Sequence, residues 1–152
     1  MLDELNGSPF YVVARLSVLI SLPMTTATQI RAQLDRILAS KAFDGAERAK
    51  SFLTFVVTTA LEGRSEDIKE SVIAVEALAR STDFDPKTDP IVRVEAGRLR
   101  SRFKTFYEAE GLNDPIAIEL PKGSYVPEFL NGATAKQTFR RQADTRHLYD
   151  SA

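Results

Sequence analysis

The chain has 152 residues, enough for one domain with a hydrophobic core, and its apolar (43%) and charged (27%) fractions are those of an ordinary globular protein. A formal charge of −1 excludes the molecule-wide positive field of a histone-like protein, so a polyanion site would have to be a local patch. The lack of cysteine and the single histidine, His147, exclude disulfide scaffolds, thiolate metal sites and the usual catalytic bases. We therefore expect no enzyme activity, catalytic residue, metal or cofactor, and a cytoplasmic location.

Residues 1–24 are predicted to be an extension of the folded domain. An apolar run occupies residues 10–24, but acidic residues precede it, Arg15 interrupts it, and it is shorter than the ~18 residues that a membrane span needs. It is therefore a poor signal sequence and a poor membrane anchor. Two interpretations stay open: the run adds a pair of β-strands to the domain, or translation starts at Met24. The position of Met24, directly before a helix cap, slightly favours the second.

Two amphipathic helices are predicted next. Thr26 and Gln29 have the spacing of a capping box, which predicts a helix from Ala27 to Ala39. A second helix is capped near Asp44 and ends at Gly63, and its apolar stripe is broad enough to form the centre of the core. The apolar residues at helical spacing are Ile30, Leu34, Ile37 and Leu38 in the first helix, and Ala49, Phe52, Leu53, Val56, Val57, Ala60 and Leu61 in the second.

A third helix is predicted from Ser65, which precedes two acidic residues, to about Ala79. Its inward residues would be Ile68, Val72, Val75 and Leu78 or their neighbours. The segment from Ser81 to Lys87 holds two aspartates and a proline, so it is a loop that no regular element crosses.

The fourth helix has a sharply defined start. Asp89 is a good N-cap and Pro90 an ideal first helical residue, so we expect the helix to run to about Glu110 before Gly111 ends it. The third and fourth helices, joined by the loop, form a candidate helix-turn-helix.

A β-hairpin is predicted after the fourth helix. Apolar residues alternate with polar ones from Ile116 to Leu120, the chain turns at Pro121-Lys122-Gly123-Ser124, and Tyr125 to Phe129 returns. The expected fold class is mainly α with a small β-hairpin wing, a winged helix-turn-helix over residues 25–129. Residues 130–152 are polar and predicted to be a frayed helix or a disordered tail.

The fourth helix concentrates positive charge. From Lys87 to Lys104 there are six basic residues against two acidic ones. A helical wheel places an apolar, inward set on one side, formed by Val92, Ala96, Leu99, Phe103 and Phe106. The residues that line the outward side are Arg93, Gly97, Arg100 and Lys104, with Arg98 and Arg102 on a flank.

This arrangement suits a DNA-binding helix, because the major groove admits one α-helix and guanidinium groups reach phosphates or pair with guanine. The alternative is a solvated face held by ion pairs such as Glu95 with Arg98 or Arg102, and charge alone favours that alternative. The preceding short helix and the following hairpin, whose tip carries Lys122, favour DNA. Gly97 fits equally well a close approach to a DNA backbone or a tolerated surface glycine.

The basic helix and hairpin resemble a known family. Pro90 to Arg100, followed by a hairpin closing on Gly123-Ser124-Tyr125, resembles the winged-helix output domain of bacterial response regulators in its Arg-Leu-Arg step and wing tyrosine. The span from about residue 26 to 129 is more closely similar to a bacterial winged-helix module often found ahead of adenylate-cyclase-like or tetratricopeptide-repeat regions. The residues that carry this similarity are Ile37 to Ser40, Phe52-Leu53, Lys69-Glu70, Phe84-Asp85-Pro86, Asp89 to Ala96 and Glu119 to Pro127.

The resemblance implies that the helix from Asp89 is a recognition helix, that Lys122 sits on the wing, and that the loop from Arg80 to Thr88 occupies the place where relatives contact RNA polymerase. One departure is the wing turn, Lys122-Gly123-Ser124-Tyr125, where output domains usually have Gly-x-Gly-Tyr.

We expect a DNA-binding transcriptional regulator whose partner is double-stranded DNA. Arg93, Arg100 and Lys104 would face the major groove, beside Gly97; Arg98 and Arg102 would reach flanking phosphates, and Lys122 would bind from the wing. The alternative is a winged-helix module that docks RNA polymerase or another regulator without reading bases, which the mildly acidic pI of 5.9 favours somewhat. A homodimer contact through the tail from Asn131 or the apolar segment before Met24 is left open.

Overall fold

The computed structural model describes residues 25–134 and 136–137. The predicted extension with its two interpretations lies outside these residues, as does the part of the predicted tail that holds His147. The first residues of that tail are described, and β2 runs to Asn131, so the hairpin extends two residues beyond the predicted domain end at 129. The elements, in chain order, are α2 (Ala27–Leu38), the 3-10 turn η1 (Lys41–Phe43), α3 (Glu47–Leu61), the 3-10 turn η2 (Ser65–Asp67), α4 (Glu70–Glu76), α5 (Ile91–Glu108), β1 (Ile116–Glu119) and β2 (Glu128–Asn131).

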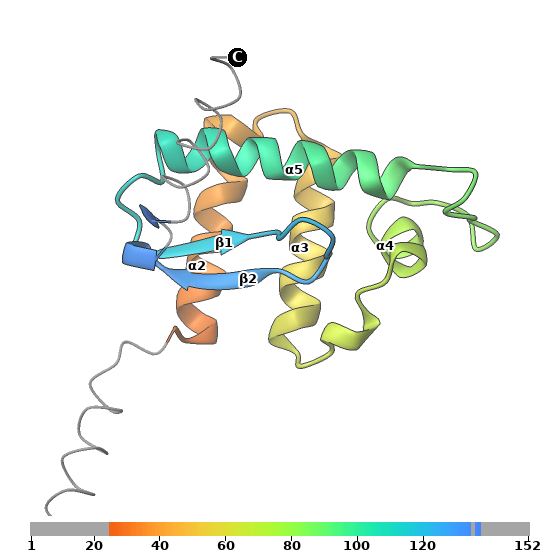
Figure 1. The fold of residues 1–152 in the computed structure, drawn as a ribbon, viewed down its shortest axis with the longest axis horizontal. Helices are drawn as coiled ribbons and strands as arrows, with labels where there is room; N and C mark the ends of the chain where they lie inside the picture. The colour runs from red at the N-terminus through yellow and green to blue at the C-terminus, as the bar shows by residue number, and fades with distance from the viewer. Residues whose placement is uncertain (1–24, 135, 138–152) are drawn as a thin grey trace, which may run out of the picture.

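The molecule is mainly helical, with a small antiparallel β-hairpin after the helices, as the sequence predicts. Figure 1 shows α5 crossing α2 and α3, with the hairpin also lying across those two helices and α4 to one side. Helix α5 contacts α3, and β1 contacts α2, so that α5 and the hairpin are both packed on the layer that α2 and α3 form. This arrangement is compatible with a winged helix.

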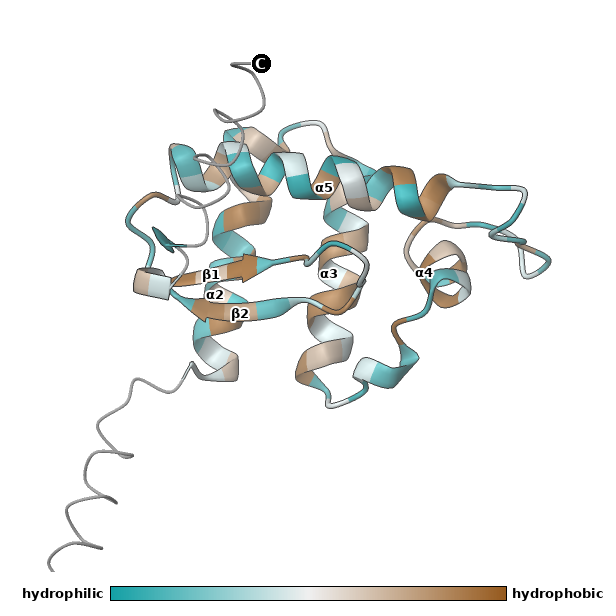
Figure 2. Ribbon diagram, in the orientation of Figure 1, coloured by the Kyte–Doolittle hydropathy of each residue, from teal (hydrophilic) through white to brown (hydrophobic). Residues whose placement is uncertain are grey.

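The core is centred on α3, as its apolar stripe predicts. Phe52, Leu53, Val56 and Val57 of this helix are all buried. The Phe52 ring meets Tyr125 edge-on, with ring centroids 6.3 Å apart, and so joins α3 to the chain that returns from the hairpin turn. Figure 2 shows hydrophobic residues on α3 and β1, and their alternation with hydrophilic ones along α5.

The first helix begins and ends almost as predicted. The Thr26 hydroxyl accepts the Gln29 N–H, and the Gln29 side chain accepts the Thr26 N–H in return, so the capping box is confirmed. The helix ends at Leu38, one residue before the expected Ala39, which is within the ordinary uncertainty of a helix boundary.

The prediction of one continuous third helix from Ser65 to Ala79 is wrong. Residues 65–67 form the separate turn η2, Lys69 is extended (φ −122°, ψ 154°), and α4 begins only at Glu70. Because the acidic residues of η2 lie in a tight turn closed by Arg64, with its Nε 2.9 Å from Asp67 Oδ2, they do not start the helix. Of the predicted inward residues, Ile68 and Leu78 are buried, whereas Val72 and Val75 are half-buried and their neighbours Ile73 and Ala74 are buried instead.

The hairpin is confirmed, but its return strand begins later than predicted. Strand β2 starts at Glu128 instead of Tyr125, and Ile116 pairs with Asn131 in the antiparallel register. Pro121 and Pro127 bracket the connection, and proline has no N–H to donate to a ladder. The connection is therefore a wide loop over residues 120–127.

Polar contacts fasten the hairpin to the helices. The Tyr107 hydroxyl on α5 accepts the N–H of Ile118 in β1 at 2.7 Å. Just before β1, the carboxylate of Asp114 accepts the Gln33 side-chain amide at 2.8 Å and the Arg36 guanidinium at 2.7 Å, both from α2. The predicted end of the fourth helix at Glu110 falls two residues late, since α5 ends at Glu108 and the chain then turns toward Asp114.

Within residues 25–134 and 136–137, the structure contains no helix of the length and apolarity that a membrane crossing requires.

Tyr107 should make the stability of the fold depend on pH in the alkaline range. Burial raises its pKa to about 12, from an ordinary value of 10. Its contribution is therefore fully present below pH 10 and is lost as the pH rises through about 12. Between pH 9 and pH 12 we expect the free energy of unfolding to fall by about 2 kcal/mol more in the native chain than in Tyr107→Phe. Urea titrations at both pH values measure this difference, and equal losses would contradict it.

Candidate nucleic-acid interface

Helix α5 begins one residue later than predicted, because Pro90 lies at the cap position instead of Asp89 and makes no side-chain cap hydrogen bond. Asp89 Oδ1 accepts the N–H of Ile91 at 3.0 Å, and the Arg80 guanidinium lies 3.3 Å from the other carboxylate oxygen. The helix starts at Ile91, immediately after Pro90. Its inward face is the predicted one, with Val92, Ala96, Leu99, Phe103 and Phe106 all buried. The packing of these residues fixes which side of α5 faces solvent.

The middle of the exposed side is formed by small or apolar residues. Val94 is 43% exposed, and Gly97 and Ser101 lie one turn and two turns further along. A Cβ built on Gly97 would meet no heavy atom within 4 Å, so packing does not require glycine there. The residues predicted for this side are mainly basic and do not include Val94 and Ser101. A helical wheel would have identified them, since both lie opposite the buried face.

Arg93 and Arg98 border this exposed strip. Arg93 Nη2 donates to the carbonyl of Pro86 at 3.0 Å, and its side chain is 55% exposed. Arg98 is 61% exposed, and its Nη1 lies 2.7 Å from Oε1 of the buried Glu95. This is one of the i, i+3 pairs that the sequence suggests.

The predicted outward residue Lys104 is partly buried and paired. Its Nζ lies 3.6 Å from Glu108 Oε1, one turn further along α5. Since Arg98 and Lys104 each have an acidic neighbour, the free positive charge on α5 is smaller than the residue count suggests.

Arg100 does not project freely from the helix, as its place in the predicted stripe implied. Its Nε donates to the Leu120 carbonyl at 2.9 Å, and its Nη2 donates to the carbonyls of Pro121 and Ser124 at 3.0 and 3.1 Å. The side chain is pulled toward the hairpin because the 120–124 loop presents carbonyls that have no strand partner. Arg100 therefore fastens the loop to α5.

Arg102 likewise has an internal partner. Its Nη1 donates to the Ala42 carbonyl in η1 at 2.6 Å, and the residue is half-buried. Its position on α5 faces the turn between α2 and α3, so the guanidinium caps that turn. Neither Arg100 nor Arg102 occupies the exposed strip that holds Val94, Gly97 and Ser101.

Lys122 lies at the exposed tip of the hairpin loop, as predicted. The turn is closed by the Ser124 N–H, which donates to the Pro121 carbonyl at 3.2 Å. Gly123 has a φ of 78°, a conformation that glycine adopts without strain. The turn thus presents Lys122 beside the carbonyls that Arg100 holds.

A polar cluster joins α4, α5 and the returning chain. Glu70 Oε1 lies 3.8 Å from Arg93 Nε, and it is buried with no hydrogen-bond donor. Burial raises the pKa of Tyr125, and the neighbouring Glu70 carboxylate raises it further. In the sequence, Glu70 stands only among the residues that carry the family resemblance and has no predicted role, because its partner lies 23 residues away along the chain.

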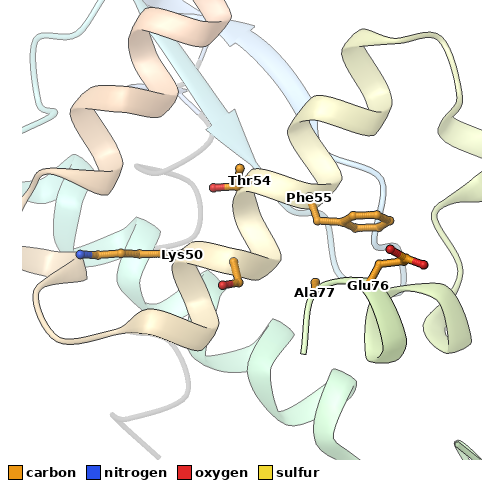
Figure 3. A pocket seen from close by; sticks show the side chains of 6 residues that line it. Lys50, Thr54, Phe55, Glu76 and Ala77 are labelled. Atoms are coloured by element: carbon orange, nitrogen blue, oxygen red, sulfur yellow. The ribbon is translucent and has the colours of Figure 1, made fainter. Parts of the chain in front are cut away.

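A shallow groove between α3 and α4 is the other feature of note. Figure 3 shows Lys50 and Glu76 at opposite ends of it, so their charges do not converge on one point. The residues that line it are Lys50, Ser51, Thr54, Phe55, Glu76 and Ala77. In the part of the chain that the structure describes, no three His, Cys, Asp or Glu side chains come together in a way that could hold a metal ion.

Replacing Arg100 should loosen the hairpin loop. Arg100→Gln removes donors to three carbonyls, and hydrogen bonds that involve a charged group contribute about 1.5 to 3 kcal/mol each at most sites. We expect a loss of about 2 kcal/mol in the free energy of unfolding and faster amide exchange at Ser124, Tyr125 and Val126. Arg98→Gln, on the same helix but bound only to Glu95, is the control and should leave the exchange of the loop unchanged. Equal exchange in both variants would contradict the role of Arg100.

Comparison of the chain with protein-family models, with curated proteins and with solved structures found no match.

Proposed function

We propose that this protein is a winged-helix transcriptional regulator that binds double-stranded DNA in a sequence-specific manner. The observation that carries the proposal is the exposed side of α5, where the uncharged strip of Val94, Gly97 and Ser101 is bordered by two exposed guanidinium groups. Small residues let a helix approach the floor of the major groove, and arginine is the residue that most often recognises guanine there. The bacterial winged-helix families that the chain resembles bind DNA with the corresponding helix.

The proposed contacts differ from those expected from the sequence alone. Arg93 and Arg98, on the first turns of α5, are assigned to the groove, because the N-terminal residues of a recognition helix usually contact the bases. Lys122 binds phosphate or the minor groove from the hairpin. Arg100 supports the interface by holding the loop that carries Lys122, and Arg102 and Lys104 contribute only to the local potential.

The decisive test is binding to a pool of mixed duplexes across a salt series, followed by sequencing of the retained DNA. A sequence-specific regulator enriches a motif, and its affinity falls steeply with salt because phosphate contacts release counterions. Arg93→Glu with Arg98→Glu should weaken binding roughly 100-fold or more, since each lost arginine contact costs about 1 to 3 kcal/mol. Thermal unfolding followed by circular dichroism is the check on folding, because each reversal places a carboxylate beside Glu70 or the buried Glu95. The binding loss is read at a temperature where the double variant keeps the helical signal of the native chain.

A matched control carries the same charge reversal elsewhere. Arg31→Glu with Lys50→Glu places it on α2 and α3, outside the exposed side of α5. This variant should bind within a few-fold of the native chain at moderate salt, because distant surface charges are screened. Equal losses in the two double variants would contradict a specific role for α5.

A second function is favoured by the internal use of Arg100 and Arg102. A module that docks a protein through the exposed loop from Arg80 to Thr88, with RNA polymerase the partner implied by the resemblance, has no need of free arginines on α5. Asp83 and Asp85 on this loop are exposed. No enrichment of DNA at low salt, together with partner binding that is insensitive to salt, would favour this function.

A further inference from the structure

The guanidinium of Arg93 is held along one edge. Its Nε faces Glu70 Oε1 at 3.8 Å, and one Nη2 N–H donates to the Pro86 carbonyl at 3.0 Å. The two anchors come from α4 and from the loop before α5, so they approach the side chain from below the exposed surface. Although it has two anchors, the Arg93 side chain is 55% exposed.

Glu70 is itself confined. It lies at the start of α4, its side chain is only 23% exposed, and Oε1 is buried without a hydrogen-bond donor. Burial raises the pKa of the Tyr125 phenol, and the charge of the neighbouring Glu70 carboxylate raises it further. Walled in by α4, by the returning chain and by α5, the carboxylate has few alternative positions. It is therefore a confined negative charge beside an arginine whose side chain is 55% exposed.

The contacts on the Nε side of the Arg93 guanidinium leave its Nη1 end free to bind a ligand. Arginine has five N–H donors, and the Pro86 carbonyl accepts one of them from Nη2. The Glu70 carboxylate attracts the Nε side of the guanidinium as an ion pair at 3.8 Å, without a hydrogen bond. Both Nη1 donors and one Nη2 donor remain, and they form the pair of parallel donors that a guanine edge or a phosphate accepts. Fixing the Nε edge reduces the rotamer freedom that would otherwise be lost on binding.

We propose that Glu70 is a positioning residue that orients Arg93 for base recognition and so contributes to the sequence specificity of the protein. This inference rests on the proposed function. Glu70 has opposite effects on two kinds of DNA. It strengthens binding to the preferred sequence by orienting Arg93, and it weakens binding to all other DNA because its negative charge repels phosphates.

The test compares Glu70→Gln with Glu76→Gln. Both variants remove one negative charge from α4, but Glu76 lies at the other end of that helix, in the groove against α3. Glu70→Gln should weaken binding to the enriched motif roughly tenfold, the loss of part of one bidentate contact, and strengthen binding to a scrambled duplex roughly twofold. Glu76→Gln should leave the ratio of the two affinities unchanged. Equal ratios in the two variants would overturn the inference while leaving the proposed function intact.

A double variant tests whether Glu70 acts through Arg93. In an Arg93→Gln background, Glu70→Gln should no longer weaken binding to the motif, because there is no guanidinium to orient. Only the roughly twofold rise in affinity from the lost repulsion should remain. A loss that persists in this background would assign Glu70 another role and overturn the inference. If the native chain prefers no motif at all, the proposed function fails and the inference fails with it.

A readout without DNA checks the contact itself. In ¹⁵N-labelled protein the Arg93 Nε–H signal, assigned by its absence in Arg93→Lys, should exchange slowly with water in the native chain. In Glu70→Gln the exchange should quicken several-fold, whereas in Glu76→Gln it should not change. Unchanged exchange in Glu70→Gln would show that the carboxylate does not restrain Arg93, and would overturn the inference whatever the DNA result.

Discussion

The structure depends above all on the burial of one face of α5 against α3, α4, the turn η1 and strand β1. Leu99, Phe103 and Phe106 form the middle of that face and are almost completely buried. Burying a side chain of this size contributes about 1.5 to 3 kcal/mol to the free energy of folding. Because this face of α5 is fixed by packing, the helix cannot rotate about its own axis. The place of every other residue on α5, in the exposed strip or on a flank, follows from this packing.

The flanks of α5 decide how its positive charge is used. Arg100 and Arg102 lie where the helix meets other backbone segments, and there each guanidinium satisfies carbonyls that have no strand or helix partner. Arg93 and Arg98 lie nearer the exposed strip and keep more than half of their side-chain surface in solvent. One helix thus divides its arginines between holding the fold and facing a ligand, and the proposed DNA contacts concern only the second kind.

Each of the two exposed arginines has an acidic residue beside it that affects its charge and its direction. Glu95 is buried under Arg98, and Glu70 is confined under Arg93. Each carboxylate lowers the local positive potential, which reduces attraction to DNA of any sequence, and each restrains the direction in which its arginine points. In a chain of formal charge −1, this arrangement would favour recognition that depends on geometry over binding that depends on charge alone.

The sequence by itself determined the helices whose signals are local: the capping box at Thr26, the start of α5 next to Asp89 and Pro90, and the apolar stripes of α3 and α5 depend on neighbours within about one turn. The order of helices and hairpin followed from these signals. Only the tertiary structure decided the late start of α4 and β2 and the partners of Arg100, Arg102 and Arg93. Their carbonyl and carboxylate partners lie 7 to 60 residues away in the chain, and no helical wheel contains them. A helical wheel shows which residues lie outside the core, but it does not show which of these contact another segment of the chain. That difference separates an arginine that holds the fold from one that is available to a ligand.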